Sequence, residues 1–312
     1  MSGYIAKLPE QVERTHVRYN NRYGIALAGD LYWERGMDPT KPHSALIVGA
    51  PYGGVKEQGP CVYAGELARR GFVVLTFDPS FNGESGGEPR HVSSPDIFTE
   101  DFSAGVDYLG RLDCVDREKI GTIGICGSGG FALSAAQVDT RIKAVVTASL
   151  VDISGNYAGL TPEERTALLD RLSRQRWTDA ENGEPEYIPS FPEEPTAEIP
   201  DGLDPMSAEF YSFYATPRGF HPRARANFTT TSESAFANYS LLGHLDTIAP
   251  RPVLILAGEN AMTRSLSEGV CERLGENGKL VIVKGANHVD LYDDVTKIPF
   301  DQIEEFFQGA LQ

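Results

Sequence analysis

The sequence predicts an α/β protein built on a mostly parallel, doubly wound sheet, with an N-terminal antiparallel hairpin and an inserted lid or cap. Two observations support this fold class. Short, fully apolar runs alternate with helical segments, which is typical of parallel strands that are covered by helices on both faces. This alternation stops near Val151 and resumes at Pro252, so an insertion interrupts the sheet.

The first element is a predicted hairpin. Apolar residues alternate with polar ones in Glu13–Asn20 and again in Ile25–Trp33, and a turn-forming segment of Asn and Gly residues separates the two runs. The later strands are expected at Ser44–Ala50, Phe72–Phe77, Ile120–Ile125, Ile142–Leu150, Pro252–Ala257 and Lys279–Lys284. The helices are expected at Ala64–Arg70, Thr99–Leu112, Phe131–Gln137, Leu266–Leu274 and Pro299–Leu311.

We expect two parts, a core of residues 1–151 and 244–312 and a cap of residues 152–243. The cap begins with a predicted helix, Thr161–Gln175, whose Thr161 and Glu164 match a capping box. Residues 179–205 contain nine acids, six prolines and no Lys or Arg, so we expect an extended, solvated segment there. Residues 208–243 are rich in aromatics, which we expect to form the core of the cap, with a minority lining a pocket.

The charge balance excludes several function classes. With 28 Lys and Arg against 44 Asp and Glu, the net charge is −16, whereas nucleic-acid grooves and anionic membranes require clustered basic residues. No apolar run reaches the roughly 18 residues of a membrane-spanning helix, and the first residues do not resemble a signal peptide, so we expect a cytoplasmic protein. The four cysteines are scattered without a C-x-x-C motif, and we expect reduced thiols, no metal and no cofactor.

The segment Ile120–Phe131 carries the strongest chemical signal. An apolar strand runs into a glycine-rich turn and directly into a helix of small residues, with Cys126 at the tip. This is the context of a nucleophile elbow, in which a strained turn exposes one side chain and the next backbone N–H, here that of Gly127, faces the oxyanion.

These residues resemble the α/β-hydrolase superfamily, and within it the dienelactone hydrolase-like branch, whose elbow reads G-x-C-x-G-G. Gly124 and Cys126 match the first glycine and the nucleophile of that motif, whereas Ser128 replaces the middle glycine. Ser128 is therefore a rival nucleophile, but we favour Cys126 because Ser128 lies one helical step beyond the turn. The resemblance covers nearly the whole chain and implies the α/β-hydrolase fold.

The resemblance also implies an oxyanion hole and a base. After the strand Ser44–Ala50, Pro51–Gly54 stands where the superfamily carries its oxyanion loop, so the N–H of Tyr52 or Gly53 is implied as the second donor beside Gly127. His288 follows the last predicted strand, which is where the family places its catalytic histidine. His221, in the cap, is a weaker second candidate with a structural or pocket role.

The triad acid is the open member. The superfamily commonly reads G-x-x-D after the strand that corresponds to Pro252–Ala257, and here that position is Ala261. Glu259 is our first choice because it is the nearest carboxylate, Asp152 is the alternative, and Asp290 is the third. A thiol tolerates a weak or absent acid better than a hydroxyl does, because its reference pKa is near 8.5.

We therefore expect a hydrolase of ester, lactone or thioester bonds that acts through a covalent acyl-Cys126 intermediate, with the thiolate favoured by His288 and by the N-terminus of the following helix. The alternatives are an acyltransferase or cyclase or a C–C bond hydrolase on the same triad, and a non-catalytic binding protein on a disabled fold. Ala261 keeps the last alternative open.

The cap suggests the substrate. Its aromatics predict an apolar or aromatic acyl group, and candidate pocket residues are Ser128, Tyr214, Arg218 and His221. Arg218, Arg223 and Arg225 either bind a carboxylate or phosphate or pair with the neighbouring acidic segment. The expected partner is a small-molecule acyl substrate, with no nucleic acid and no membrane, and a homodimer is left open.

Overall fold

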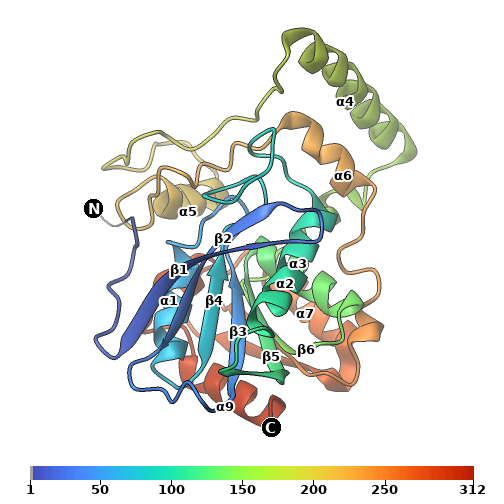
Figure 1. Ribbon diagram of the computed structural model, residues 1–312. Helices are drawn as coiled ribbons and strands as arrows, with labels where there is room; N and C mark the ends of the chain where they lie inside the picture. The colour runs from blue at the N-terminus through green and yellow to red at the C-terminus, as the bar shows by residue number, and fades with distance from the viewer. Residues whose placement is uncertain (1–2) are drawn as a thin grey trace.

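The computed structural model describes residues 3–312 and confirms the predicted fold class (Figure 1). One eight-stranded sheet has the order β1-β2-β4-β3-β5-β6-β7-β8. The hairpin strands β1 and β2 pair antiparallel, β2 pairs antiparallel with β4, and the remaining pairs are parallel. The strands are β1 (Val12–Asn20), β2 (Ala26–Glu34), β3 (His43–Gly49), β4 (Val73–Phe77), β5 (Val115–Ile125), β6 (Ile142–Ala148), β7 (Val253–Gly258) and β8 (Gly278–Val283).

Helices cover both faces of this sheet. The two faces alternate along each central strand: in β3, Leu46 and Val48 belong to one buried cluster, whereas Ala45 and Ile47 belong to the other. The first cluster includes residues of α1 (Gly59–Ala68) and α9 (Phe300–Ala310). The second includes residues of α2 (Pro95–Leu109), α3 (Gly127–Val138) and α7 (Arg264–Leu274). The central strands are therefore buried on both sides, as predicted, whereas the edge strand β8 is only half-buried.

Several helices begin earlier than expected. α3 starts at Gly127, directly after Cys126, rather than at Phe131, and α1 starts at Gly59 rather than Ala64. Glycine has low helix propensity, but both helical starts are buried against the sheet, and this tertiary packing outweighs propensity. The early start of α3 matters most, because it places the first helical turn directly behind Cys126.

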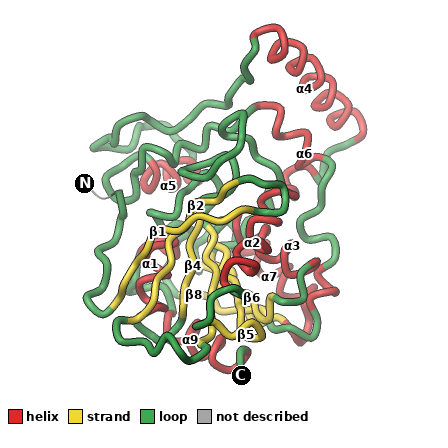
Figure 2. The backbone as a smooth tube through the Cα atoms, viewed as in Figure 1, coloured by secondary structure: helices red, strands yellow, loops and turns green. Residues whose placement is uncertain are grey.

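Residues 149–252 connect β6 to β7 and contain α4 (Pro162–Asn182), α5 (Pro205–Tyr214) and α6 (Glu233–Ala237). The capping box of Thr161 is present, and α4 projects away from the body (Figure 1). Residues 183–204 form no helix or strand, as expected, and run as a loop in Figure 2. The expected extended segment was too long, because residues 179–182 form the last turn of α4 and Pro205 begins α5. Helix α5 was not predicted; the Asp204 carboxylate caps it by accepting the N–H groups of Met206 and Ser207. Within residues 3–312, no helix combines the length and apolarity needed to cross a membrane.

Candidate active site

Cys126 stands at a strained turn between β5 and α3. Its φ of 55° and ψ of −121° lie in a region that side-chain-bearing residues rarely adopt, and such strain is maintained where the surrounding structure fixes it. Gly124 makes the turn possible, because a Cβ there would lie 2.2 Å from the carbonyl oxygen of Ser128. The strand, turn and helix predicted around Cys126 are therefore present.

Two backbone N–H groups converge on the sulfur. The N–H groups of Gly127 and Tyr52 both donate hydrogen bonds to Cys126. Gly127 permits this approach, since a Cβ on it would lie 2.7 Å from the Cβ of Tyr52. Of the two candidates for the second donor, Tyr52 is the one that faces the sulfur, whereas a Cβ on Gly53 would point at Ala226, 2.6 Å away. The pair has the arrangement of an oxyanion hole.

Ser128 is turned away from this position. Its hydroxyl donates to the carbonyl oxygen of Ala50, at the end of β3, and the residue is buried in the first turn of α3. It also lines a small hollow beneath the loop after β3, together with Tyr52 and Phe131. The geometry therefore presents the thiol rather than this hydroxyl at the tip of the elbow.

His288 lies between β8 and α8 (Asp290–Asp293) and is completely buried. Its Nδ1 is 2.9 Å from the Thr263 hydroxyl oxygen, and its Nε2 is 2.9 Å from the Tyr292 hydroxyl oxygen. The Ser149 hydroxyl donates to the His288 carbonyl at 2.7 Å, which fixes the backbone of the loop. Both ring nitrogens therefore have hydroxyl partners.

The structure does not bring a candidate acid to His288. Glu259 is exposed, and its carboxylate accepts the N–H of Gly285 at 2.8 Å. Asp152 accepts the Ser154 hydroxyl at 2.5 Å, and Asp290 binds Lys297 at 2.6 Å. Within residues 3–312, Thr263 takes the place on Nδ1 that a triad carboxylate would occupy. The expected pairing of Glu259 with His288 is absent because the glutamate, at the exposed end of β7, bends toward the loop after β8.

The expected thiolate is also not favoured in this closed arrangement. Burial lowers the pKa of His288 to about 4, so the imidazole is neutral above that pH. Burial raises the pKa of the Cys126 thiol, and the hydrogen bonds from Tyr292, Gly127 and Tyr52 offset this only in part. The resting pair is therefore a neutral thiol and a neutral imidazole.

Aromatic side chains of α5 cover the Cys126 thiol. Tyr214 is buried and packs edge-on against Tyr292, with ring centroids 6.4 Å apart, and both side chains lie close to Cys126. The ring of Phe210 meets that of His288 edge-on, with centroids 5.3 Å apart. Because Cys126 is 6% exposed, an acyl group reaches the sulfur only when covering side chains move. Of the four candidate pocket residues, Tyr214 lies at the thiol.

The other basic candidates bind carboxylates elsewhere. Arg218 pairs with Asp293 at 2.7 Å, and Arg225 pairs with Glu193 of the acidic segment at 3.0 Å. His221 is buried, its Nδ1 accepts the N–H of Arg223 at 3.2 Å, and a Cβ on Gly3 would lie 3.0 Å from its Nε2. The expected pairing with the acidic segment is thus present for Arg225, whereas Arg218 pairs with carboxylates of α8 and His221 packs against the N-terminal segment.

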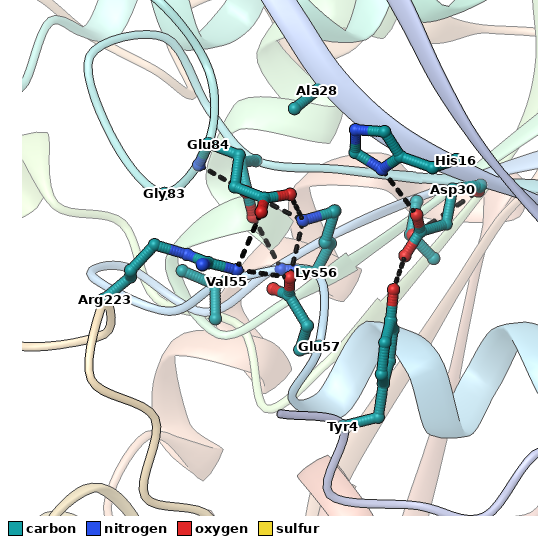
Figure 3. Close-up of polar contacts among 12 residues, drawn as sticks. Tyr4, His16, Ala28, Asp30, Val55, Lys56, Glu57, Gly83, Glu84 and Arg223 are labelled. Carbon is teal, nitrogen blue, oxygen red and sulfur yellow. Dashed lines mark hydrogen bonds and ion pairs between the residues drawn. The ribbon is translucent and has the colours of Figure 1, made fainter. Parts of the chain in front are cut away.

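A buried ionic cluster joins three parts of the chain (Figure 3). The Lys56 ammonium is fully buried, at 2.6 Å from Glu57, 3.2 Å from Asp78 and 2.6 Å from Glu84. Arg223, which follows α5, reaches Glu57 at 2.6 Å. The three carboxylates are spaced closely enough for a metal ion, but the lysine already supplies the positive charge among them. The cluster ties the residues after β3 and β4 to the segment between β6 and β7.

Two residues of the centre, Thr263 and Tyr292, were not singled out from the sequence. Tyr292 lies four residues after His288, which is one helical turn and a spacing that brings two side chains together. This signal was available in the sequence. Thr263 carried no comparable signal, because its role depends on how the loop after β7 folds beside His288.

The fold, the strained elbow and the paired backbone N–H groups are typical of enzymes with the α/β-hydrolase fold. The model of the Alpha/beta hydrolase family matches residues 46–297, and the chain belongs to this family.

Several relatives share nearly the whole chain. The Uncharacterized protein PA2218 of Pseudomonas aeruginosa is 47% identical over 97% of this chain and 82% of its own length. Its crystal structure superposes with a TM-score of 0.93, covering 99% of this chain and 97% of that chain. The Uncharacterized protein YcjY of Escherichia coli is 35% identical over 88% of this chain and 90% of its own length.

A fungal relative carries a functional name. Polyketide transferase grgF of a Penicillium species is 27% identical over 93% of this chain and 95% of its own length. Its crystal structure superposes with a TM-score of 0.79 at 22% identity, covering 96% and 99% of the two chains, which shows the shared fold. More distant relatives are named acyltransferase and thiohydrolase.

Proposed function

We propose that this protein hydrolyses ester, lactone or thioester bonds through a covalent acyl-Cys126 intermediate. One observation carries the proposal: at a strained elbow, the N–H groups of Gly127 and Tyr52 both donate to the Cys126 sulfur. An acyl carbon attached to that sulfur would hold its oxygen near the same donors. The structure supports a thiol nucleophile without a carboxylate partner, because a thiol needs less activation than a hydroxyl.

The chemistry follows from these positions. His288 acts as the base that removes the thiol proton, the sulfur attacks the acyl carbon, and the two N–H groups stabilise the oxyanion. Collapse of this intermediate expels the leaving group, which takes up a proton, and an acceptor then releases the acyl group from Cys126. Loss of one oxyanion donor typically slows such a reaction on the order of a hundred- to a thousand-fold.

An apolar or aromatic acyl group suits the surroundings. The side chains around the thiol are aromatic: Tyr214 and Tyr292 lie beside Cys126, and the ring of Phe210 lies against that of His288. Relatives named polyketide transferase and thiohydrolase support a thioester as the acyl donor. We keep the cytoplasm as the proposed compartment, in agreement with unpaired cysteines.

Transfer to an acceptor other than water is the second candidate. The observation that favours it is the burial of the thiol, which is 6% exposed beneath the side chains of α5. A site that excludes water protects an acyl intermediate from hydrolysis until another nucleophile arrives. Transferase and cyclase chemistry on the same nucleophile are both included in this candidate.

Intact-protein mass spectrometry tests the proposal. Wild type, Cys126→Ala and Ser128→Ala are mixed briefly with an activated aromatic ester and an activated aromatic thioester. The expected result is an acyl adduct on wild type and on Ser128→Ala that is lost in Cys126→Ala. An adduct lost in Ser128→Ala and retained in Cys126→Ala would refute the assignment of the nucleophile. The decay of the adduct in water, with and without added alcohols and amines, then separates hydrolysis from transfer.

A further inference from the structure

The imidazole of His288 has no ring nitrogen free for the thiol in this arrangement. Nδ1 is 2.9 Å from the Thr263 hydroxyl and Nε2 is 2.9 Å from the Tyr292 hydroxyl. An imidazole has two hydrogen-bonding nitrogens, and each makes one in-plane contact. Direct proton transfer from Cys126 would therefore require Tyr292 to leave its place.

The Tyr292 hydroxyl lies between the base and the nucleophile. It lies 2.9 Å from His288 Nε2, and it is also close enough to the Cys126 thiol to lower the pKa of that thiol, with the Tyr214 hydroxyl nearby. Its ring is fixed by packing: Phe213 meets it edge-on, with centroids 5.1 Å apart, and its relative exposure is 0%. The phenol is thus held with its oxygen at the junction of three groups.

We propose that the Tyr292 hydroxyl relays the proton between Cys126 and His288, so that the base acts on the thiol through a phenol rather than by contact. This inference rests on the proposed acyl-Cys126 function. The relay uses the tautomer in which Nδ1–H donates to the Thr263 hydroxyl and Nε2 accepts from the Tyr292 hydroxyl. The Tyr292 O–H bond breaks as its proton passes to Nε2, and the Cys126 S–H bond breaks as its proton passes to the phenol oxygen. The sulfur keeps the electron pair that attacks the acyl carbon.

The relay avoids a free phenolate. Because the phenol gains one proton as it loses another, the step is compatible with burial, which strongly disfavours ionised tyrosine here. The imidazolium formed on His288 returns its proton along the same path when the leaving group departs. The phenol then again donates to Nε2, and the acyl group remains on Cys126.

Single-turnover acylation kinetics test the relay. The acylation rate of Cys126 by an aromatic thioester is measured for wild type, Tyr292→Phe and a matched control, Tyr63→Phe. Tyr63 is also a buried tyrosine, and its hydroxyl donates to the carbonyl of Leu291 at 2.7 Å, beside Tyr292 in α8. Removal of a proton-transfer group typically costs about 10²- to 10⁴-fold in rate. We therefore expect at least a hundredfold loss in Tyr292→Phe and less than about threefold in Tyr63→Phe.

A proton inventory, which measures the acylation rate of the wild type in mixtures of H₂O and D₂O, distinguishes a proton relay from a purely structural role of Tyr292. Two protons in flight predict a curved, quadratic dependence of the acylation rate on the deuterium fraction of the solvent, whereas one predicts a straight line. This measurement also decides the question if Tyr292→Phe does not fold. A linear inventory, or Tyr292→Phe within threefold of Tyr63→Phe, overturns the relay while leaving the acyl-Cys126 function standing. A wild type that forms no adduct overturns both.

Discussion

Replacing Thr263 by aspartate would place a carboxylate beside His288 where this chain has a hydroxyl. Thr263 directly precedes α7, and its hydroxyl lies 2.9 Å from Nδ1. A helix N-terminus accommodates a negative charge. The substitution therefore installs the missing triad acid at a position that already contacts the base.

The expected magnitude follows from the burial of His288. Burial lowers its pKa from 6.5 to about 4, and at about 1.4 kcal/mol for each pKa unit this is a penalty of about 3 kcal/mol on the imidazolium. An opposite charge within hydrogen-bonding distance raises the pKa of its partner by about 1 to 3 units. The Thr263→Asp variant should thus titrate His288 at a pH between about 5 and 7.

The assay is an NMR titration of the histidine ring protons, with the His288 signal assigned by its loss in His288→Gln. Thr263→Asn is the matched control, because its amide has the shape of the aspartate but no charge. We expect the aspartate variant alone to titrate at the higher pH. Equal titration of the two variants, or a wild-type midpoint near the ordinary value for histidine, would refute the account of burial and missing charge.

Three further predictions concern stability and the elbow. His288 has a lowered folded-state pKa, so its neutral form stabilises the fold above about pH 6.5 and this contribution is lost toward pH 4; urea titrations should show the stability difference between wild type and His288→Gln changing by about 3 kcal/mol over that window, and a constant difference would contradict it. Lys56→Met leaves the buried carboxylates of Glu57 and Asp78, and the partly exposed one of Glu84, without their ammonium. It should lower the free energy of unfolding by about 3–5 kcal/mol, against under about 1 kcal/mol for the exposed Lys41→Met; equal effects would show that burial of the cluster does not strengthen its ion pairs. Gly124→Ala puts a Cβ 2.2 Å from a backbone oxygen of α3 and should lower both melting temperature and acylation rate, whereas Gly269→Ala in α7, with open space around its Cβ, should be neutral or stabilising; a tolerated Gly124→Ala would contradict the close approach.

Much of the fold could be predicted because the strands are recognisable in the sequence as short, continuous apolar runs. The continuous apolar runs in the strands β3 to β7 match their burial on both faces, so these strands can be recognised in the sequence. The helix α5 was missed because its aromatic residues were interpreted as the core of the inserted segment. Its start depends on hydrogen bonds to the Asp204 carboxylate at its N-terminus. The start of α3 was likewise missed, because its glycines have low helix propensity and packing against the sheet stabilises the helix there. The division into a core and a cap stays a prediction.

The site was predictable where local chain geometry fixes it. The strand-to-helix turn places Cys126 and the N–H of Gly127 from sequence alone, and chain order points to the loop of His288. The acid could not be predicted, because side-chain contacts across loops depend on a tertiary arrangement that spacing does not encode. Glu259 is near in sequence but turned outward, while Thr263 reaches the imidazole after the loop bends back. The charges of the Cys126 thiol and the His288 imidazole depend on how deeply the two groups are buried, and this depth cannot be read from the sequence.

The segment that covers Cys126 is tethered at both ends. Residues 149–252 leave the sheet at the end of β6 and return to it at β7, and these two strands are hydrogen-bonded neighbours. Closure over the thiol is therefore an intramolecular equilibrium, whose position depends on neither protein concentration nor encounter with a partner. A substrate shifts this equilibrium only through its different affinity for the open and closed forms. Acyl groups would thus be selected by how well they allow these residues to close around Cys126.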